Sequence, residues 1–289
     1  MLLCLASLKG SPGVTTLGVA LSARWPQPWR RVLVEADPAG GDLAARYRLA
    51  LAPGLISLAA AARRSTDAAL VGEHTQTLVG GLAVVVGPTR PDQARAALTA
   101  ITGADGRAGV LGSYTGRDDV VAVVDCGRLD PDGPAGPIIV AADQLLILAR
   151  PRADELAHVA DQVISGIVDG PARTRLLLVG PGYPAAEVTR EVGLSVAGTV
   201  PWDPRTAAAV SGQGARTPRP RAALVRTATR LANKLAGDPR RIGSGPADHA
   251  ATDPAPEGVP DPEEQGKTLP GPWTTVSPNG SGPPRRGWP

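Results

Sequence analysis

Short apolar segments that alternate with helical segments constrain this sequence more than any other feature. The apolar runs are continuous and lie at 2–7, 32–36, 82–87, 120–125, 145–150, 175–180 and 195–201. Continuous runs of this length are typical of strands that are buried on both faces of a parallel sheet. Helical segments are predicted at 14–25, 92–101, 153–168, 185–191 and 219–236. This alternation predicts an α/β fold with a doubly wound, mostly parallel sheet flanked by helices.

The composition changes at Gly237. The last 53 residues contain 12 prolines and 9 glycines, about 40% of the segment. This exceeds the roughly 25–30% that marks low complexity, and the scattered apolar residues cannot offset the entropy of ordering. We therefore expect a domain at 1–236 and a disordered Pro/Gly-rich tail at 237–289.

Two cysteines, Cys4 and Cys126, lie inside predicted strands, where cysteine is usually a small core residue. We expect free thiols and a reducing, cytoplasmic compartment. The N-terminal apolar run lacks the basic segment of a secretory signal, and no run reaches the ~20 apolar residues of a membrane-spanning helix. The net charge of +3 over 289 residues is too small to indicate a nucleic-acid or membrane partner by itself.

The most informative local motif is the glycine-rich loop SLKGSPGVTT at 7–16. It follows a predicted strand and opens a predicted helix, so its backbone N–H groups converge where they can bind a phosphate. Gly10 and Gly13 permit a sharp turn, and Thr15 occupies the position of the Mg²⁺-binding hydroxyl of a P-loop. The strict GxxxxGK[ST] pattern is broken at Leu8 and Val14. Taken alone, the loop fits a structural turn equally well.

Acidic residues at two strand ends accompany this loop. Glu35 and Asp37 lie in VLVEADPAGG, and Asp125 ends the apolar strand VVAVVD in the manner of a Walker B motif. Ligands bind at the carboxyl ends of the strands in open parallel sheets. As alternatives, Asp37 caps a turn and Asp125 satisfies backbone amides. Because three such features occur in order, we favour a nucleotide site whose Mg²⁺ is held by Thr15, Asp37 and Asp125.

Together these motifs resemble the MinD/ParA branch of P-loop ATPases, whose deviant Walker A motif reads KGGxGKTT. Here it reads KGSPGVTT, so Lys9 stands at the family's signature position. Glu35 and Asp37 match the paired acids of the family's second motif, and Asp125 matches its Walker B aspartate. The resemblance, which covers about 1–236, implies ATP and Mg²⁺ as cofactors and a homodimer that encloses the nucleotides. It also implies catalytic roles for Lys9, which reaches the partner's phosphates, and for Asp37, which orients water.

The resemblance also implies a nucleotide-binding set. Its members are Lys9, Gly10, Ser11, Pro12, Gly13, Val14, Thr15, Thr16, Trp202 and Asp203. The last two belong to GTVPWDPRTAAAVSGQG (198–214), which is similar to the family's strand and P-x-D loop beside the nucleobase. Ordinary packing is the alternative role for Trp202.

Two departures from the family bear on activity. Val14 replaces the lysine that contacts the β- and γ-phosphates, and the loss of one charge-assisted hydrogen bond costs about 1.5–3 kcal/mol, or about 10- to 150-fold in affinity. The family's asparagine after the strand at 175–180 is replaced by Gly180 or Gly182, which puts adenine specificity in doubt. A loss of affinity of this size still permits weak nucleotide binding. We do not expect efficient hydrolysis, because phosphoryl transfer depends on neutralising charge in the transition state.

The helix predicted at 219–236 carries two stripes. The apolar stripe consists of Leu224, Ala228, Leu231 and Leu235, and the basic stripe consists of Arg226, Arg230 and Lys234. The basic stripe predicts weak contact with DNA or an acidic membrane. The alternative, which we favour, is a terminal helix docked on the sheet with a solvated outer face.

These observations leave competing functions. The first is a MinD/ParA-like switch that dimerises on ATP and positions, partitions or recruits a protein partner, with weak or absent hydrolysis. The second is a pseudo-ATPase scaffold for protein–protein interaction, which Val14 and the missing asparagine favour. A metabolic P-loop ligase or kinase on the same fold lacks a visible substrate site. The three histidines are scattered, without cysteine or carboxylate at metal-ligand spacing.

Overall fold

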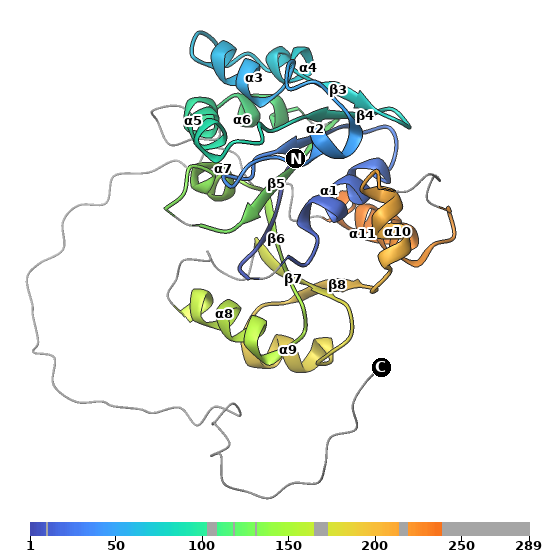
Figure 1. The fold of residues 1–289 in the computed structure, drawn as a ribbon. Coiled ribbons are helices and arrows are strands. Elements are labelled where there is room, and N and C mark those ends of the chain that lie inside the picture. Colours follow the sequence, from blue (N-terminus) through green and yellow to red (C-terminus); the bar gives the residue numbers. More distant parts are fainter. Residues whose placement is uncertain are drawn as a thin grey trace, which may run out of the picture. The chain divides into compact units, whose positions relative to one another are not determined.

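The computed structural model describes residues 1–9, 11–102, 109–117, 119–130, 132–164, 173–213 and 219–238. The predicted disordered tail, beyond Asp238, lies outside the described residues, and so does Gly10 of the glycine-rich loop. Figure 1 shows the described part as a central sheet with helices packed on its faces.

Within the described residues, eight strands form one sheet in the order β3-β4-β2-β5-β1-β6-β7-β8. They are β1 (Leu2–Ser7), β2 (Arg30–Glu35), β3 (Gln76–Leu78), β4 (Leu82–Val85), β5 (Val120–Arg128), β6 (Gln144–Ala149), β7 (Thr174–Val179) and β8 (Val196–Val200). The β3–β4 pair is antiparallel and the other neighbouring pairs are parallel. The predicted doubly wound, mostly parallel sheet is confirmed.

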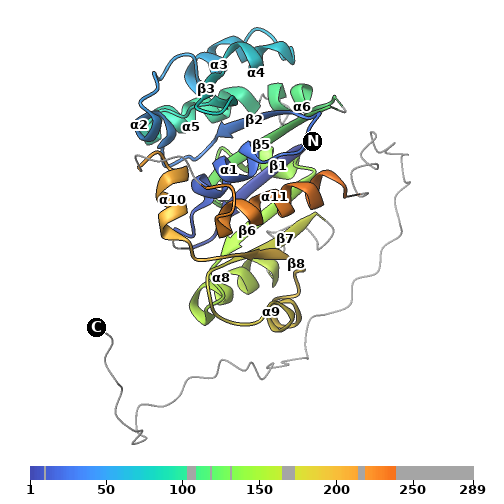
Figure 2. The ribbon, with the colours of Figure 1, turned by 90° about the vertical axis from the view of Figure 1, so that its right-hand side faces the viewer.

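Helices cover both faces of the sheet. The described helices are α1 (Val14–Ala23), α2 (Leu43–Tyr47), α3 (Leu55–Ala62), α4 (Ala69–Glu73), α5 (Pro91–Thr102), α6 (Gly109–Thr115), α7 (Gly136–Val140), α8 (Ala153–Ile164), α9 (Ala185–Val192), α10 (Pro204–Val210) and α11 (Ala223–Ala236). One apolar cluster packs α1, α2, α10 and α11 against one face of the sheet. A second cluster packs the helices from α3 through α9 against the other face. Figure 2 views the molecule from the side of α1, α10 and α11. Burial on both faces explains why the strand sequences are continuously apolar.

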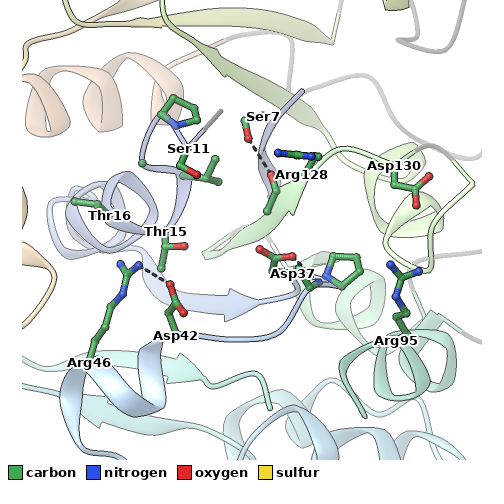
Figure 3. A pocket seen from close by; sticks show the side chains of 16 residues that line it. Ser7, Ser11, Thr15, Thr16, Asp37, Asp42, Arg46, Arg95, Arg128 and Asp130 are labelled. Atoms are coloured by element: carbon green, nitrogen blue, oxygen red, sulfur yellow. Dashed lines mark hydrogen bonds and ion pairs between the residues drawn. The ribbon is translucent and has the colours of Figure 1, made fainter. Parts of the chain in front are cut away.

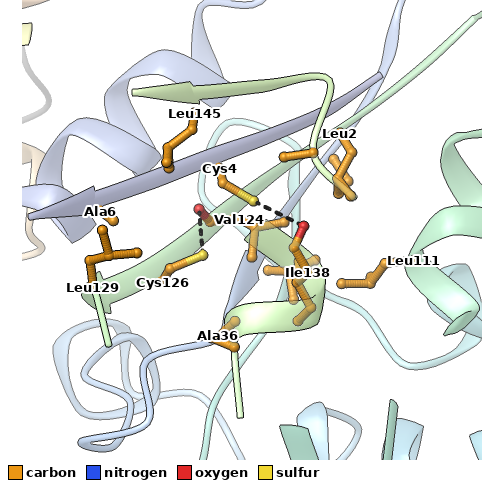
Figure 4. Packing of buried hydrophobic residues seen from close by; sticks show 14 of the residues in the cluster. Leu2, Cys4, Ala6, Ala36, Leu111, Val124, Cys126, Leu129, Ile138 and Leu145 are labelled. Atoms are coloured by element: carbon orange, nitrogen blue, oxygen red, sulfur yellow. Dashed lines mark hydrogen bonds between the residues drawn. The ribbon is translucent and has the colours of Figure 1, made fainter. Parts of the chain in front are cut away.

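The two cysteines lie in the cluster that α3 to α9 share with the sheet. Both are fully buried and free, as predicted. The Sγ atom of Cys4 lies 3.8 Å from the carbonyl oxygen of Ile138, and that of Cys126 lies 3.9 Å from the carbonyl oxygen of Val124 (Figure 4). They are small apolar core residues on adjacent strands.

The last described helix, α11, packs on the sheet. The apolar stripe predicted from the sequence is buried, from Leu224 to Leu235. Arg226 and Arg230 are exposed, and the Nζ atom of Lys234 donates a hydrogen bond of 3.0 Å to the carbonyl oxygen of Ala197 in β8. Docking of this helix is confirmed, while contact of its basic face with DNA or membrane stays a prediction. Among the described residues, no helix combines the length and the apolar character needed to cross a membrane.

Candidate functional site

A pocket of about 440 Å³ opens where β1, β2 and β5 end, in front of the glycine-rich loop (Figure 3). It is lined by Ser7, Ser11, Pro12, Gly13, Val14, Thr15, Thr16, Asp37, Pro38, Ala39, Asp42, Arg46, Arg95, Gly127, Arg128 and Asp130. Gly13 has a φ of 95°, a conformation that favours glycine, and its carbonyl oxygen accepts the first hydrogen bond of α1, from the N–H of Leu17 at 2.9 Å. The loop therefore turns sharply and begins a helix whose N-terminus is directed at the pocket, as an anion site requires.

Asp125 lies in β5, beside the end of β2, and is fully buried. Its Oδ1 atom accepts a hydrogen bond of 3.0 Å from the N–H of Gly127, as the structural alternative predicted. Its Oδ2 atom is also buried but has no hydrogen-bond partner among the described residues. Burial raises the pKa of Asp125 to about 6, and the Thr15 hydroxyl opposes that shift. An unpartnered buried carboxylate oxygen next to a threonine hydroxyl is the donor set that suits Mg²⁺, so these residues fit the ion that the motif implies.

Asp37 follows β2 and lines the pocket. Its Oδ1 atom accepts a hydrogen bond of 2.7 Å from the N–H of Ala39, so it does cap a turn. Burial raises the pKa of this half-buried carboxyl above its ordinary value. Gly127, at a φ of 61°, passes so close that a Cβ atom there would overlap the Asp37 carboxyl group. The capping role and a role in the pocket are compatible, because a carboxylate offers two oxygens.

Glu35, the other acid of the predicted pair, is buried and does not line the pocket. Its carboxyl group accepts three backbone hydrogen bonds, from Asp42 at 2.6 Å, Leu43 at 2.9 Å and Gly87 at 2.9 Å. Burial raises its pKa to about 7 although these hydrogen bonds favour the ionised form. Glu35 therefore holds the loop behind Asp37 and the start of α2.

Lys9 and Thr16 are each engaged with a distant element. The Nζ atom of Lys9 lies 3.0 Å from Nε2 of His158 on α8; both side chains are exposed, and Lys9 is not among the pocket-lining residues. The hydroxyl oxygens of Thr16 and Ser211 lie 2.9 Å apart and join α1 to the end of α10. Val14, at the lysine position, packs its side chain into the apolar cluster and is 7% exposed. The first turn of α1 thus presents hydroxyl groups and backbone to the pocket.

The predicted base-side residues follow β8. Trp202 is 64% exposed, so the packing alternative is wrong. A Cβ atom at Gly180 would lie 3.9 Å from its ring, so the ends of β7 and β8 adjoin there. Asp203 caps α10 through a hydrogen bond of 3.1 Å from the N–H of Thr206, and it also accepts one of 3.4 Å from Leu224. Neither Trp202 nor Asp203 lines the pocket of the glycine-rich loop.

Several pocket residues were not predicted from the sequence. They are Ser7, Pro38, Ala39, Asp42, Arg46, Arg95, Gly127, Arg128 and Asp130. Asp42 and Arg46 are brought there by the five-residue helix α2, which has no periodic signal of its own. Arg128 ends β5 and Asp130 follows it, so both lie within five residues of Asp125. Their closeness in sequence to this Walker B-like aspartate was the one signal that could have indicated them.

Comparisons with known proteins support the fold. No family model matches the chain, and no curated protein matches it in sequence. Among solved structures, a ParA family ATPase from Chlorobium tepidum TLS superposes with a TM-score of 0.65 at 18% identity, covering 81% of this chain and 98% of that one. The septum site-determining protein MinD from Pyrococcus horikoshii OT3, complexed with Mg-ADP, gives 0.62 at 16% identity over 82% and 97%. McdA from Cyanothece, in a complex with ATP, gives 0.54 at 17% identity over 81% and 95%. The chain is therefore similar in fold to ParA, MinD and McdA ATPases over about four fifths of its length.

Proposed function

We propose that this protein is a MinD/ParA-like nucleotide switch, which binds ATP with Mg²⁺, dimerises on it and so positions, partitions or recruits a protein partner. The observation that carries the proposal is one arrangement. The loop at the start of α1 and Asp37 line one pocket. Asp125 lies buried beside the Thr15 hydroxyl of that loop, and its Oδ2 atom lacks a partner among the described residues. The structural relatives add support, since the MinD and McdA structures carry Mg-ADP and ATP.

In this proposal each element of the site has a defined task. The backbone N–H groups of the loop, from Gly13 to Thr16 at the N-terminus of α1, bind the phosphates. Thr15, Asp37 and Asp125 hold Mg²⁺, which when bound neutralises phosphate charge, and Asp37 orients water. Trp202 offers an exposed aromatic face to the nucleobase beside Gly180.

Slow hydrolysis belongs to the same proposal. Val14 is buried in an apolar cluster, so the first turn of α1 offers no lysine to the β- and γ-phosphates. Lys9 lies outside the pocket of the single chain and contacts His158. In a dimer, Lys9 would supply charge to the partner's nucleotide. ATP binding would then lead to dimerisation and not to rapid hydrolysis.

A pseudo-ATPase scaffold is the second candidate. The Thr16–Ser211 hydrogen bond favours it, because this hydroxyl of the loop is already engaged with α10. The buried Val14 favours it too, because an apolar side chain packed in the core occupies the position of the phosphate-binding lysine. In the scaffold, the pocket binds no nucleotide, and protein partners bind other surfaces or the tail.

Calorimetric titration with Mg²⁺-ATP and Mg²⁺-ADP separates the two. The switch predicts binding in the micromolar to millimolar range, lost in Asp125→Ala and kept in Asp67→Asn, which changes an exposed carboxyl between α3 and α4 outside this pocket. Thermal unfolding of each variant verifies that it is folded. If the wild-type protein binds neither nucleotide at millimolar concentration, the switch is excluded and the scaffold stands.

A further inference from the structure

Because Val14 replaces the loop lysine, the positive charge that offsets a bound triphosphate must come from another residue of the pocket. Three carboxyl groups line the pocket, those of Asp37, Asp42 and Asp130. A triphosphate entering it would add further negative charge, which must be offset at close range to be bound. Three arginines also line the pocket, and they come from α2, α5 and β5.

These arginines, Arg46, Arg95 and Arg128, differ in position and restraint. Figure 3 shows Arg46 beside Thr15, on the side of the pocket that α1 forms, whereas Arg95 lies on the opposite side near Asp130. Arg95 and Arg128 are exposed, while the Arg46 side chain is 25% exposed and pairs with Asp42 at 2.5 Å.

The helix that carries Arg46 is fixed at both ends. The Glu35 carboxyl group accepts hydrogen bonds from the N–H groups of Asp42 and Leu43 at its start. At its end, the Tyr47 hydroxyl donates a hydrogen bond to the carbonyl oxygen of Val210 on α10. These contacts tie α2 to the sheet and to α10, so the Arg46 backbone is held in place and its guanidinium group needs little ordering on binding.

We propose that Arg46 supplies to a bound nucleoside triphosphate the positive charge that Val14 cannot. The inference rests on the proposed nucleotide site and adds a phosphate-binding residue that stands outside the glycine-rich loop. A guanidinium group carries five N–H donors in a planar fork. It can keep one on Asp42 and turn others to phosphate oxygens. A change from the loop lysine to Arg46 therefore moves the cation from α1 to α2 within the same pocket.

Calorimetric titration of the full chain with Mg²⁺-ATP tests the inference. We expect Arg46→Gln to weaken binding by about 10- to 150-fold, the range for one charge-assisted hydrogen bond, and Arg46→Lys to restore part of it. Arg63→Gln, which changes an exposed arginine directly after α3 and outside this pocket, should bind like the wild type. The Asp42 carboxyl is 60% exposed, so the Arg46→Gln variant leaves no buried charge without a partner and should stay folded. Its melting temperature verifies this.

A double-mutant cycle adds a second, independent measurement. If Arg46 does the work of the missing lysine, Arg46→Gln should cost much less affinity in a Val14→Lys background than in the wild type. Equal affinity of wild type and Arg46→Gln for Mg²⁺-ATP would overturn the inference and leave the nucleotide switch intact. A loss confined to Arg95→Gln or Arg128→Gln would overturn it as well, by assigning the charge to another arginine. Absence of binding by the wild type would instead remove the proposed function itself.

Discussion

The Glu35 carboxyl group accepts a hydrogen bond of 2.6 Å from the backbone N–H of Asp42, and this contact links the interior of the sheet to the helix beside the pocket. The group is buried, and burial raises its pKa from 4.5 to about 7. A carboxyl whose folded-state pKa exceeds its unfolded value binds its proton more tightly in the folded state. Its contribution to stability is therefore fully present below about pH 4.5 and is lost as the pH rises through about 7.

The first prediction follows from the raised pKa of Glu35, which lowers the stability of the fold as the pH increases. The free energy of unfolding of the wild type should fall between pH 5 and pH 8, by an amount on the order of 3 kcal/mol from Glu35. Asp125, whose pKa is raised to about 6, adds to the fall in the same direction. Urea unfolding at several pH values measures it, and Glu35→Gln should flatten the profile. An identical pH profile in the Glu35→Gln variant would show that Glu35 does not titrate in this range.

The second prediction concerns the end of the described chain. Deletion of 239–289 should leave the melting temperature nearly unchanged, because the composition of that segment offers little to bury. Asp238, just before the deletion, pairs with Arg175 at 2.9 Å, and their side chains are 11% and 8% exposed. Asp238→Ala in the full chain should therefore cost about 3–5 kcal/mol, since it leaves a buried arginine without its charge partner.

Thermal unfolding of the two variants beside the wild type compares these effects directly. A large drop in melting temperature on deletion would mean that the segment packs on the domain, contrary to the sequence-based prediction. An unchanged melting temperature in Asp238→Ala would show that the ion pair contributes nothing.

Much of the fold was predictable from the sequence, and particular residues show why. The seven predicted strands correspond to β1, β2 and β4 to β8, because strands buried on both faces must be continuously apolar. The three-residue antiparallel strand β3 was missed, and so were the helices α2, α3, α4, α6, α7 and α10, because segments of five to eight residues give only a weak periodic signal.

The site was predictable only in the part that one continuous segment encodes. The loop up to Thr16 and Asp37 line the pocket and were predicted because each follows an apolar strand. Asp125 was predicted because it follows the apolar run of β5, and it lies buried beneath the pocket-lining residues. The position of Arg46 was not, because it depends on contacts of Glu35 and Tyr47 that join distant parts of the chain. The partner of Lys9 in the single chain is equally remote, since His158 lies 149 residues away.

The third prediction restores the loop lysine. Val14→Lys should raise the affinity for Mg²⁺-ATP by about 10- to 150-fold and raise the rate of hydrolysis, because a lysine there adds a charge-assisted hydrogen bond. Val14 is 7% exposed, so the substitution also costs some packing. Val14→Met, a longer side chain without charge, is the matched control and should bind ATP like the wild type. A wild type that hydrolyses ATP as fast as Val14→Lys would mean that another cation already completes the site.

The last prediction concerns Lys9 and dimerisation. In the single chain, Nζ of Lys9 lies 3.0 Å from His158, and both side chains are exposed, so Lys9 can leave this partner without uncovering a buried charge. If Lys9 reaches the nucleotide of a second copy, Lys9→Ala should abolish ATP-dependent dimerisation while the melting temperature stays unchanged. The physical reason is that two triphosphates held face to face repel each other unless a cation lies between them. His158→Ala removes the same contact but keeps the charge, so it should dimerise like the wild type. Light scattering of the three proteins, each with and without a non-hydrolysable ATP analogue, measures the outcome. A wild type that stays monomeric with saturating analogue, or a Lys9→Ala variant that dimerises equally well, would contradict the role assigned to Lys9.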